Sequence, residues 1–142
     1  MTRASEAIAV VRRNTEEVQG RGNFEVFDEL FAADFVDHTP QRGFGTDREA
    51  VRGLYRAVRA AFPDFRPEIH FQVVAGDEMV TTYKTYHGTH RGPFMGVAPT
   101  GKRARFDTVD VMRVRGGRIV EHWGVADLLR VMIQMGVLAG PS

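Results

Sequence analysis

Apolar residues recur at helical spacing at the start of the chain. Between Ser5 and Gln19 they fall near every third or fourth position among arginines and glutamates, which predicts an amphipathic helix ended by Gly20. Asn23 can cap a second, short helix, whose apolar stripe runs to Phe31 and is closed by 33–34. We therefore expect two N-terminal helices.

A third helix is predicted after a stretch rich in turn-forming residues. Residues 35–40 are too few for a helix and end at a proline, so we expect a brief extended segment and then a loop to Gly45. Thr46-Asp-Arg-Glu49 has the spacing of a capping box, in which the Thr oxygen and the Glu carboxylate bind each other's free amides. An apolar stripe that includes Tyr55 follows, and Pro63 ends the helix.

Alternating apolar and polar residues replace the helical pattern after Pro63. The alternation predicts a strand before Gly76-Asp77 and another from Met79 to His87. Residues 88–102 carry glycines and prolines, and we expect a loop long enough to lie over an opening.

The last third of the chain predicts a second hairpin and one more helix. Residues 106–115 and 118–125 form the hairpin across Gly116-Gly117. Asp127 can cap a final helix, which Gly136 ends.

Helices that precede antiparallel hairpins, with one late helix, define an α+β fold. No internal repeat or linker is present, so residues 1–142 are expected to form a single domain. A curved, mostly antiparallel sheet packed on N-terminal helices tends to form a cone, and the mouth of such a cone can bind a small molecule.

The turn of the second hairpin decides which side chains share a face. If Arg115-Gly116-Gly117 is a three-residue loop, Val114 pairs with Arg118 and Asp110 lies opposite His122. A carboxylate at that distance could orient an imidazole for acid/base catalysis. The same register puts an apolar wall around the pair, formed by Phe106, Thr108, Met112, Val114, Val120 and Gly124.

Two readings of this hairpin remain open. A two-residue turn would instead place Trp123 opposite Asp110 and move His122 to the other face of the sheet. In the first register an Asp-His pair can also be a purely structural hydrogen bond. The opposite face would carry an apolar patch that indicates either a homodimer interface or packing under a helix, formed by Val109, Val111, Ile119, Trp123 and Val125.

Two further side chains are candidates for binding a substrate. His38 follows an aspartate and precedes a proline-bounded loop, so it could reach the pocket or could hydrogen-bond the loop. Tyr55 lies on the core stripe of the third helix and would offer a hydroxyl to a cavity, or would bond to a backbone carbonyl.

Composition narrows the function classes. Nineteen basic against eighteen acidic residues leave a net charge of +1, and no run of Lys or Arg could follow a phosphate backbone, so we expect no nucleic-acid partner. Cysteine is absent and no segment approaches the roughly 20 apolar residues of a membrane span, so we expect a cytoplasmic protein without a membrane partner. His87 and His90 lack a third ligand at diagnostic spacing, so we expect no metal.

Several short segments together resemble the SnoaL-like polyketide cyclases, which have the nuclear transport factor 2-like (cystatin-like) α+β barrel. The likeness covers nearly the whole chain. The segments that carry it are Asp34-Phe-Val-Asp-His38, Ala61-Phe-Pro-Asp64, Gly88-Thr-His-Arg-Gly92, Gly96-Val-Ala-Pro-Thr-Gly101, Gly117-Arg-Ile-Val-Glu-His-Trp123 and Gln134-Met-Gly136.

The resemblance implies a dimer that cyclises an aromatic polyketide ester by a cofactor-free aldol reaction. Members of the family carry an acid/base aspartate where this chain has Gly124, and a pocket histidine where it has Asp110. Asp110 and His122 could have exchanged those roles. The alternatives are an isomerase, a dehydratase or an epoxide hydrolase on the same fold, or a small-molecule-binding protein without turnover.

Overall fold

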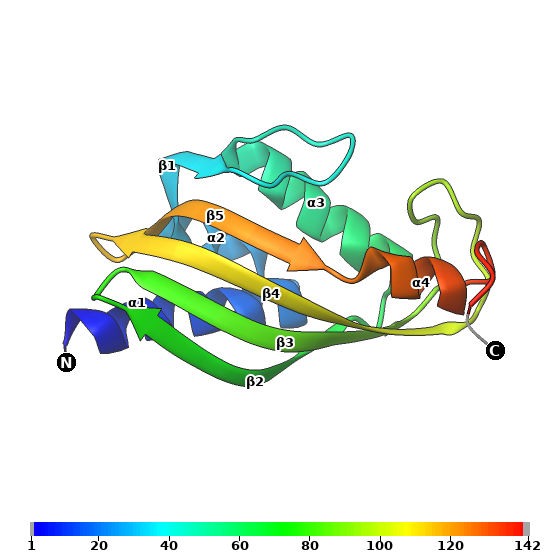
Figure 1. Cartoon of the computed structure of the whole chain (residues 1–142). Helices are drawn as coiled ribbons and strands as arrows, with labels where there is room; N and C mark the ends of the chain where they lie inside the picture. The colour runs from blue at the N-terminus through cyan, green and yellow to red at the C-terminus, as the bar shows by residue number, and fades with distance from the viewer. Residues whose placement is uncertain (1, 141–142) are drawn as a thin grey trace.

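A curved five-stranded sheet with helices on one face forms the structure, a computed structural model that describes residues 2–140 (Figure 1). The strand order is β1-β5-β4-β3-β2, and the β1–β5 pair is parallel while the other pairs are antiparallel. The sheet does not close into a barrel. The α+β fold with a mostly antiparallel sheet is thus confirmed.

The elements have the following bounds. They are α1 (Arg3–Arg13), η1 (Asn14–Gly20), η2 (Phe24–Val26), α2 (Phe27–Leu30), β1 (Phe31–Asp37), α3 (Arg48–Ala61), β2 (Arg66–Ala75), β3 (Met79–Thr89), β4 (Arg103–Arg115), β5 (Arg118–Ala126) and α4 (Leu128–Gln134). None of the helices within residues 2–140 is long and apolar enough to cross a membrane.

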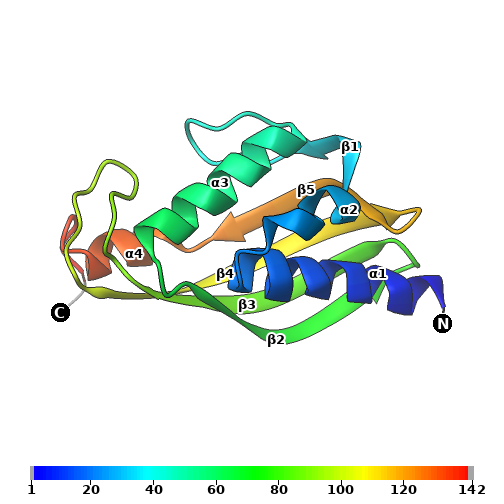
Figure 2. The ribbon, with the colours of Figure 1, turned by 180° about the vertical axis from the view of Figure 1, so that it is seen from behind.

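The N-terminal helix agrees with its predicted range. The α-helix α1 continues without a break into the π-helical turns of η1, and Val11 and Val18 are fully buried against the sheet. Figure 2 shows α1 and α3 lying across the same face of the sheet. That shared face is where the core and the cavity described below are found.

The second helix is shorter than its sequence pattern predicts. It has four residues, and Phe31, which we expected on its apolar stripe, begins β1 instead. Pairing with β5 gives the backbone of β1 its hydrogen bonds, so a tertiary contact outweighs the local helical pattern. The stripe still serves the core, because the rings of Phe27 and Phe31 stack with centroids 4.3 Å apart.

The third helix begins one residue later than the capping box predicts. Asp47 is the N-cap residue, and its carboxylate accepts a hydrogen bond of 2.8 Å from the amide of Ala50. The helix ends before Pro63, as expected, and buries Val51 and Tyr55. The capping role predicted for Thr46 is therefore wrong, although the helix itself is confirmed.

The second hairpin has the two-residue turn that the sequence left open as an alternative, followed by a bulge that the sequence did not suggest. Gly116 and Gly117, both at positive φ, form a two-residue turn, so Val114 pairs with Ile119. One residue further along, Val120 forms a β-bulge and shifts the register once more. The bulge adds one residue to β5 between the turn and His122. His122 therefore faces the helices, as a three-residue loop would have placed it, even though the turn has two residues.

The two-residue turn also corrects the predicted membership of the two faces. It pairs Ile119, expected on the outer patch, with the inward-facing Val114, and Ile119 is fully buried in the core against the helices. Along β4 the even-numbered residues from Ala104 to Val114 are buried, which agrees with the predicted inner face of that strand. Asp110 pairs with Gly124, and His122 pairs with Met112.

Residues 90–102 form a loop that is tied down at both ends, and this loop was predicted. The amide of His90 bonds to the carbonyl of Lys102, and the amide of Gly92 bonds to the carbonyl of Ala61 at the end of α3. A Cβ on Gly92 would lie only 2.4 Å from the carbonyl oxygen of Ala60. The loop can approach the helix this closely only because position 92 has no side chain.

Two glycine substitutions should therefore have opposite effects. Gly92→Ala should lower the free energy of unfolding by about 1 to 3 kcal/mol, because backbone must move to admit the methyl group. Gly53→Ala, in the middle of α3 with open space around it, should raise it by about 1 kcal/mol through helix propensity. Urea unfolding measures both. Equal effects of the two substitutions would contradict the close approach at Gly92.

Candidate functional site

A cavity of about 280 Å³ lies between α3 and the inner face of β4 and β5. Most of its wall is apolar, which suits a small organic molecule. Aromatic and aliphatic side chains from several elements supply that wall, among them Phe31, Phe35, Leu54, Phe94, Phe106 and Met112. A few polar groups interrupt it, and their arrangement determines which chemistry the cavity can support.

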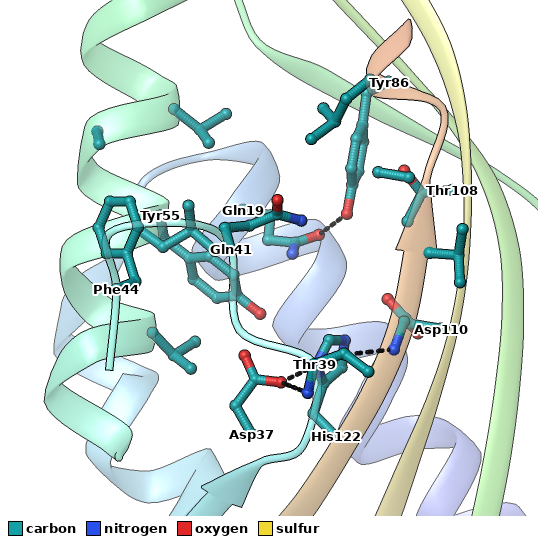
Figure 3. A pocket seen from close by; sticks show the side chains of 18 of the residues that line it. Gln19, Asp37, Thr39, Gln41, Phe44, Tyr55, Tyr86, Thr108, Asp110 and His122 are labelled. Carbon is teal, nitrogen blue, oxygen red and sulfur yellow. Dashed lines mark hydrogen bonds and ion pairs between the residues drawn. The ribbon is translucent and has the colours of Figure 1, made fainter. Parts of the chain in front are cut away.

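His122 and Asp37 form a hydrogen-bonded pair at one end of the cavity (Figure 3). Nδ1 of His122 lies 2.9 Å from a carboxylate oxygen of Asp37, and that oxygen also accepts a bond of 3.0 Å from the amide of Thr39. The parallel pairing of β1 with β5 places Asp37 directly beside His122. Asp37 is almost completely buried, so its negative charge acts on the imidazole with little screening by solvent.

The Asp37 carboxyl is ionised more easily than an isolated one. Burial alone raises its pKa, but the hydrogen bond and charge of His122, together with the bonds from Thr39, outweigh burial and hold the pKa below its ordinary value of 3.8. An anionic Asp37 favours the tautomer of His122 that carries its proton on Nδ1. Nε2 then presents a lone pair.

That lone pair faces the cavity in a space left by a glycine. A Cβ on Gly124 would lie 2.9 Å from Nε2 of His122 and 3.2 Å from Cβ of Asp110. The imidazole thus fills the place in which a side chain at position 124 would begin. Gly124 is held in position by its amide, which donates a 2.8 Å bond to the hydroxyl of Thr39.

Asp110 pairs with Lys84 and not with His122. Nζ of Lys84 lies 2.9 Å from a carboxylate oxygen of Asp110, and both side chains are almost wholly inaccessible to solvent. Burial by itself lowers the pKa of Lys84, but the charge of Asp110 outweighs burial and raises it, so the ammonium stays charged. The predicted Asp110–His122 dyad is therefore replaced by two separate pairs.

Further polar groups surround the buried ammonium. Gln19 accepts a bond of 3.3 Å from Nζ of Lys84 and one of 3.4 Å from the hydroxyl of Tyr86. The hydroxyl of Tyr55 accepts a bond of 3.0 Å from the amide of Asn14. Burial raises the pKa of Tyr55, so its hydroxyl keeps its proton and can donate it in a hydrogen bond.

Most of the side chains predicted to contact a substrate line the cavity, and two do not. The predicted residues that line it are Tyr55, Phe106, Thr108, Asp110, Met112, His122 and Gly124. Val120 is absent from the lining because it is the extra residue of the bulge. His38 lies on the opposite side of β5, where it stacks on Trp123 at 4.6 Å and bonds to Glu121 at 2.8 Å.

Three polar residues of the site were missed by the sequence analysis. Asp37 was noticed only as the neighbour of His38, because nothing local indicates that β1 joins the sheet beside His122. Lys84 lies at a position of β3 whose side chain the alternating pattern directs into the core. A lysine at such a buried position could have been recognised from the sequence as a candidate site residue. Gln19 ends a helix, and no pattern along the chain connects it with β3.

The two histidines considered as metal ligands make other contacts. His87 bonds to Glu68 at 2.9 Å, and His90 is buried with Nδ1 3.0 Å from the hydroxyl of Thr100. Within residues 2–140 no three His, Cys, Asp or Glu side chains gather closely enough to hold a metal ion.

Comparison with known proteins gives consistent matches. The family model described as SnoaL-like polyketide cyclase matches residues 9–135. The nogalonic acid methyl ester cyclase of Streptomyces nogalater is 27% identical over 116 residues, which cover 81% of this chain and 87% of that protein.

Two solved structures show the same fold. IdmH of Streptomyces antibioticus, named as a candidate polyketide cyclase, is 33% identical with a TM-score of 0.79, over 92% of this chain and 98% of that one. AclR of Streptomyces galilaeus superimposes with a TM-score of 0.85 over 98% and 86% of the two chains, but at 24% identity it supports the fold alone.

The Asp37–His122 contact predicts a specific pH dependence of stability. The lowered pKa of Asp37 means that its contribution is complete above the ordinary carboxyl pKa of 3.8 and is lost as the pH falls through the lower value of the folded state. Asp37→Asn should lower the free energy of unfolding by about 1 to 3 kcal/mol at neutral pH, and by progressively less as the pH falls. Asp34→Asn, at an exposed position of the same strand, is the control. Urea unfolding is measured from neutral pH to below 3.8. A loss of stability in Asp37→Asn that does not vary with pH would contradict the contact.

Proposed function

Because the chain belongs to the SnoaL-like polyketide cyclase family, we propose that it binds a largely apolar polyketide ester in the cavity and cyclises it by a cofactor-independent aldol reaction. His122 is the general base. The observation that carries the proposal is the pairing of His122 with Asp37, which leaves Nε2 available on the wall of a largely apolar cavity.

The reaction needs one proton to leave and return. Nε2 of His122 removes a proton from a carbon that lies between two carbonyl groups, which gives an enolate and an imidazolium ion. Asp37 stabilises the imidazolium through Nδ1, because its buried negative charge lies 2.9 Å away. The enolate carbon then bonds to the carbon of a further carbonyl group elsewhere in the same substrate. The resulting alkoxide takes the proton back from His122.

The developing negative charge needs a donor on the other side of the substrate. The hydroxyl of Tyr55 points into the cavity from α3, and it accepts a bond from Asn14 while its own proton remains available (Figure 3). A hydrogen bond to the enolate oxygen stabilises the transition state more than the ground state, since charge grows there during the reaction.

Asp110 does not suit the role of base in this scheme. Its carboxylate is bound to the ammonium of Lys84, and removal of a proton by Asp110 would weaken a fully buried ion pair. The imidazole instead fills the space beside Gly124, where the family carries its aspartate. The base function thus moves from a residue at position 124 to His122, which occupies the same space.

Substitution of His122 tests the assignment. His122→Gln should lower turnover by about 100-fold or more while the affinity for ligand changes little, because general-base catalysis typically contributes a factor of that size. His38→Gln is the matched control, since His38 also bonds to a carboxylate but lies outside the cavity.

Two assays are suitable. One is cyclisation of nogalonic acid methyl ester, the compound after which the relative from Streptomyces nogalater is named. The other is hydrogen-deuterium exchange at the acidic carbon of a naphthyl β-keto ester, followed by NMR in mildly acidic deuterated water. If His122→Gln and His38→Gln reduce both rates equally, or if wild type binds the ester and accelerates neither process, the catalytic proposal is wrong.

We also propose that a second copy of the chain covers the outer face of the sheet. Large apolar side chains from three strands are exposed there, namely Phe71, Val73, Val109 and Val125. The same face carries acidic residues (Glu68, Asp107) and basic residues (Arg105, Arg113), so a two-fold related copy can meet opposite charges. The occupant that this combination favours is therefore another molecule of the same protein.

The mass in solution tests this interface. Val109→Glu and Phe71→Glu should each convert a dimer into a monomer, because they place an unpaired charge in a buried contact. Val137→Glu changes an equally exposed apolar residue after α4 and is the control. Light scattering coupled to size-exclusion chromatography measures the mass. A wild-type protein that is monomeric at every concentration would rule the interface out.

A further inference from the structure

Two polar atoms on β4 have no hydrogen-bond partner among residues 2–140. They are Oδ1 of Asp110 and the hydroxyl oxygen of Thr108, and both are buried. Both residues line the cavity, and Figure 3 shows their side chains on the same wall. Buried polar atoms are normally satisfied, because leaving one unpaired costs about 1 to 3 kcal/mol. Two such atoms side by side on a ligand-facing wall require an explanation.

The buried lysine fixes the state of the first atom. Lys84 binds Oδ2 of Asp110 at 2.9 Å and Gln19 at 3.3 Å, so the carboxylate is held in place from behind. The buried ammonium and the carboxylate form an ion pair. An ionised carboxylate has no proton to donate, so Oδ1 can only accept a hydrogen bond.

This restricts the group that can lie beside Asp110. A carbonyl, ether or carboxylate oxygen would meet Oδ1 with lone pair against lone pair, whereas a hydroxyl would form a strong, charge-assisted bond. Thr108 is less selective, because its hydroxyl can donate or accept. Same-face residues of a strand are about 6.6 Å apart, so the two atoms bind two separate groups of a ligand.

We propose that Asp110 and Thr108 determine specificity for an apolar ring compound that carries an enol or phenol hydroxyl on one edge. The hydroxyl donates to Oδ1 of Asp110, and a second oxygen on the same edge bonds to Thr108. Lys84 is a positioning residue that keeps the carboxylate charged and fixed. The inference rests on the proposed function, since it assumes that the cavity binds a ligand, but it does not depend on His122 acting as a base.

Thr108→Val is the cleanest test, because it removes the hydroxyl and leaves the Lys84–Asp110 ion pair intact. The probes are a dihydroxynaphthalene and the dimethylnaphthalene with the same substitution pattern, and their affinities are measured by fluorescence titration. Thr108→Val should weaken the dihydroxy probe by about three- to tenfold and leave the dimethyl probe unchanged. The unliganded variant should be at least as stable as wild type, because an unsatisfied hydroxyl is lost.

Thr82→Val is the matched control on the neighbouring strand. Thr82 is equally buried and pairs with Asp110 across the sheet, but its hydroxyl accepts a bond of 3.1 Å from Gln72 and does not line the cavity. Thr82→Val should lower stability and leave the affinities for both probes unchanged.

Asp110→Asn extends the test to the carboxylate. Paired with Lys84→Met, which removes the ammonium that would otherwise be left unpaired, it should weaken the dihydroxy probe about tenfold or more. Lys84→Met alone removes the ammonium but keeps the carboxyl group of Asp110. It therefore separates the effect of the ion pair from the effect of the acceptor oxygen on probe affinity.

The outcomes distinguish the two proposals. If wild type binds both probes equally and Thr108→Val alters neither affinity, the specificity inference is wrong while the ligand-binding function stands. If wild type binds neither probe nor the polyketide ester, both fail together. Discrimination between the probes that is lost in Thr108→Val but kept in His122→Gln would support the inference independently of catalysis.

Discussion

The parallel pairing of β1 with the edge of β5 is the constraint on which the site depends. Without it the sheet would end at β5, and His122 would face the cavity with no carboxylate beside it. With it, Asp37 lies next to His122 and the two side chains bond at 2.9 Å. The same pairing shortens α2 and brings the loop of Thr39 over β5, where Thr39 fixes the amide of Gly124. One backbone contact therefore sets the local structure, the geometry and the electrostatics of the site.

The cavity separates its two carboxylates into different environments. Asp37 faces an imidazole that can gain and lose a proton, whereas Asp110 faces an ammonium whose pKa is raised. An imidazole that is hydrogen-bonded to a carboxylate suits proton transfer, whereas a carboxylate held in an ion pair with a buried ammonium does not. Two acids of the same type thus have different partners, one an imidazole and the other an ammonium.

A small residue at position 124 also decides where the His122 ring can lie. The chain has Gly124 where its family carries an acid/base aspartate, yet the space is not lost, because the His122 ring lies 2.9 Å from where a Cβ would be. A carboxylate at 124 and an imidazole in its present orientation could not both fit. The present orientation of the His122 ring therefore requires a residue without a side chain at position 124.

The sequence by itself determined the order of elements, the α+β class and the inner face of β4. These follow from local periodicity, caps and turn residues, because each requires contacts only between residues close along the chain. It also identified Asp110 and His122 as polar residues of an apolar wall. The partners of both were decided only by the tertiary structure. The bulge at Val120 restores the face of His122 through a register shift that no local signal specifies.

Asp37 reaches His122 from β1, which is distant from β5 in the sequence. Lys84 reaches Asp110 from β3, the strand next to β4 in the sheet. The strength of each pairing comes from burial, and burial depends on how the whole sheet curves against its helices. Periodicity along one strand carries no information about that curvature.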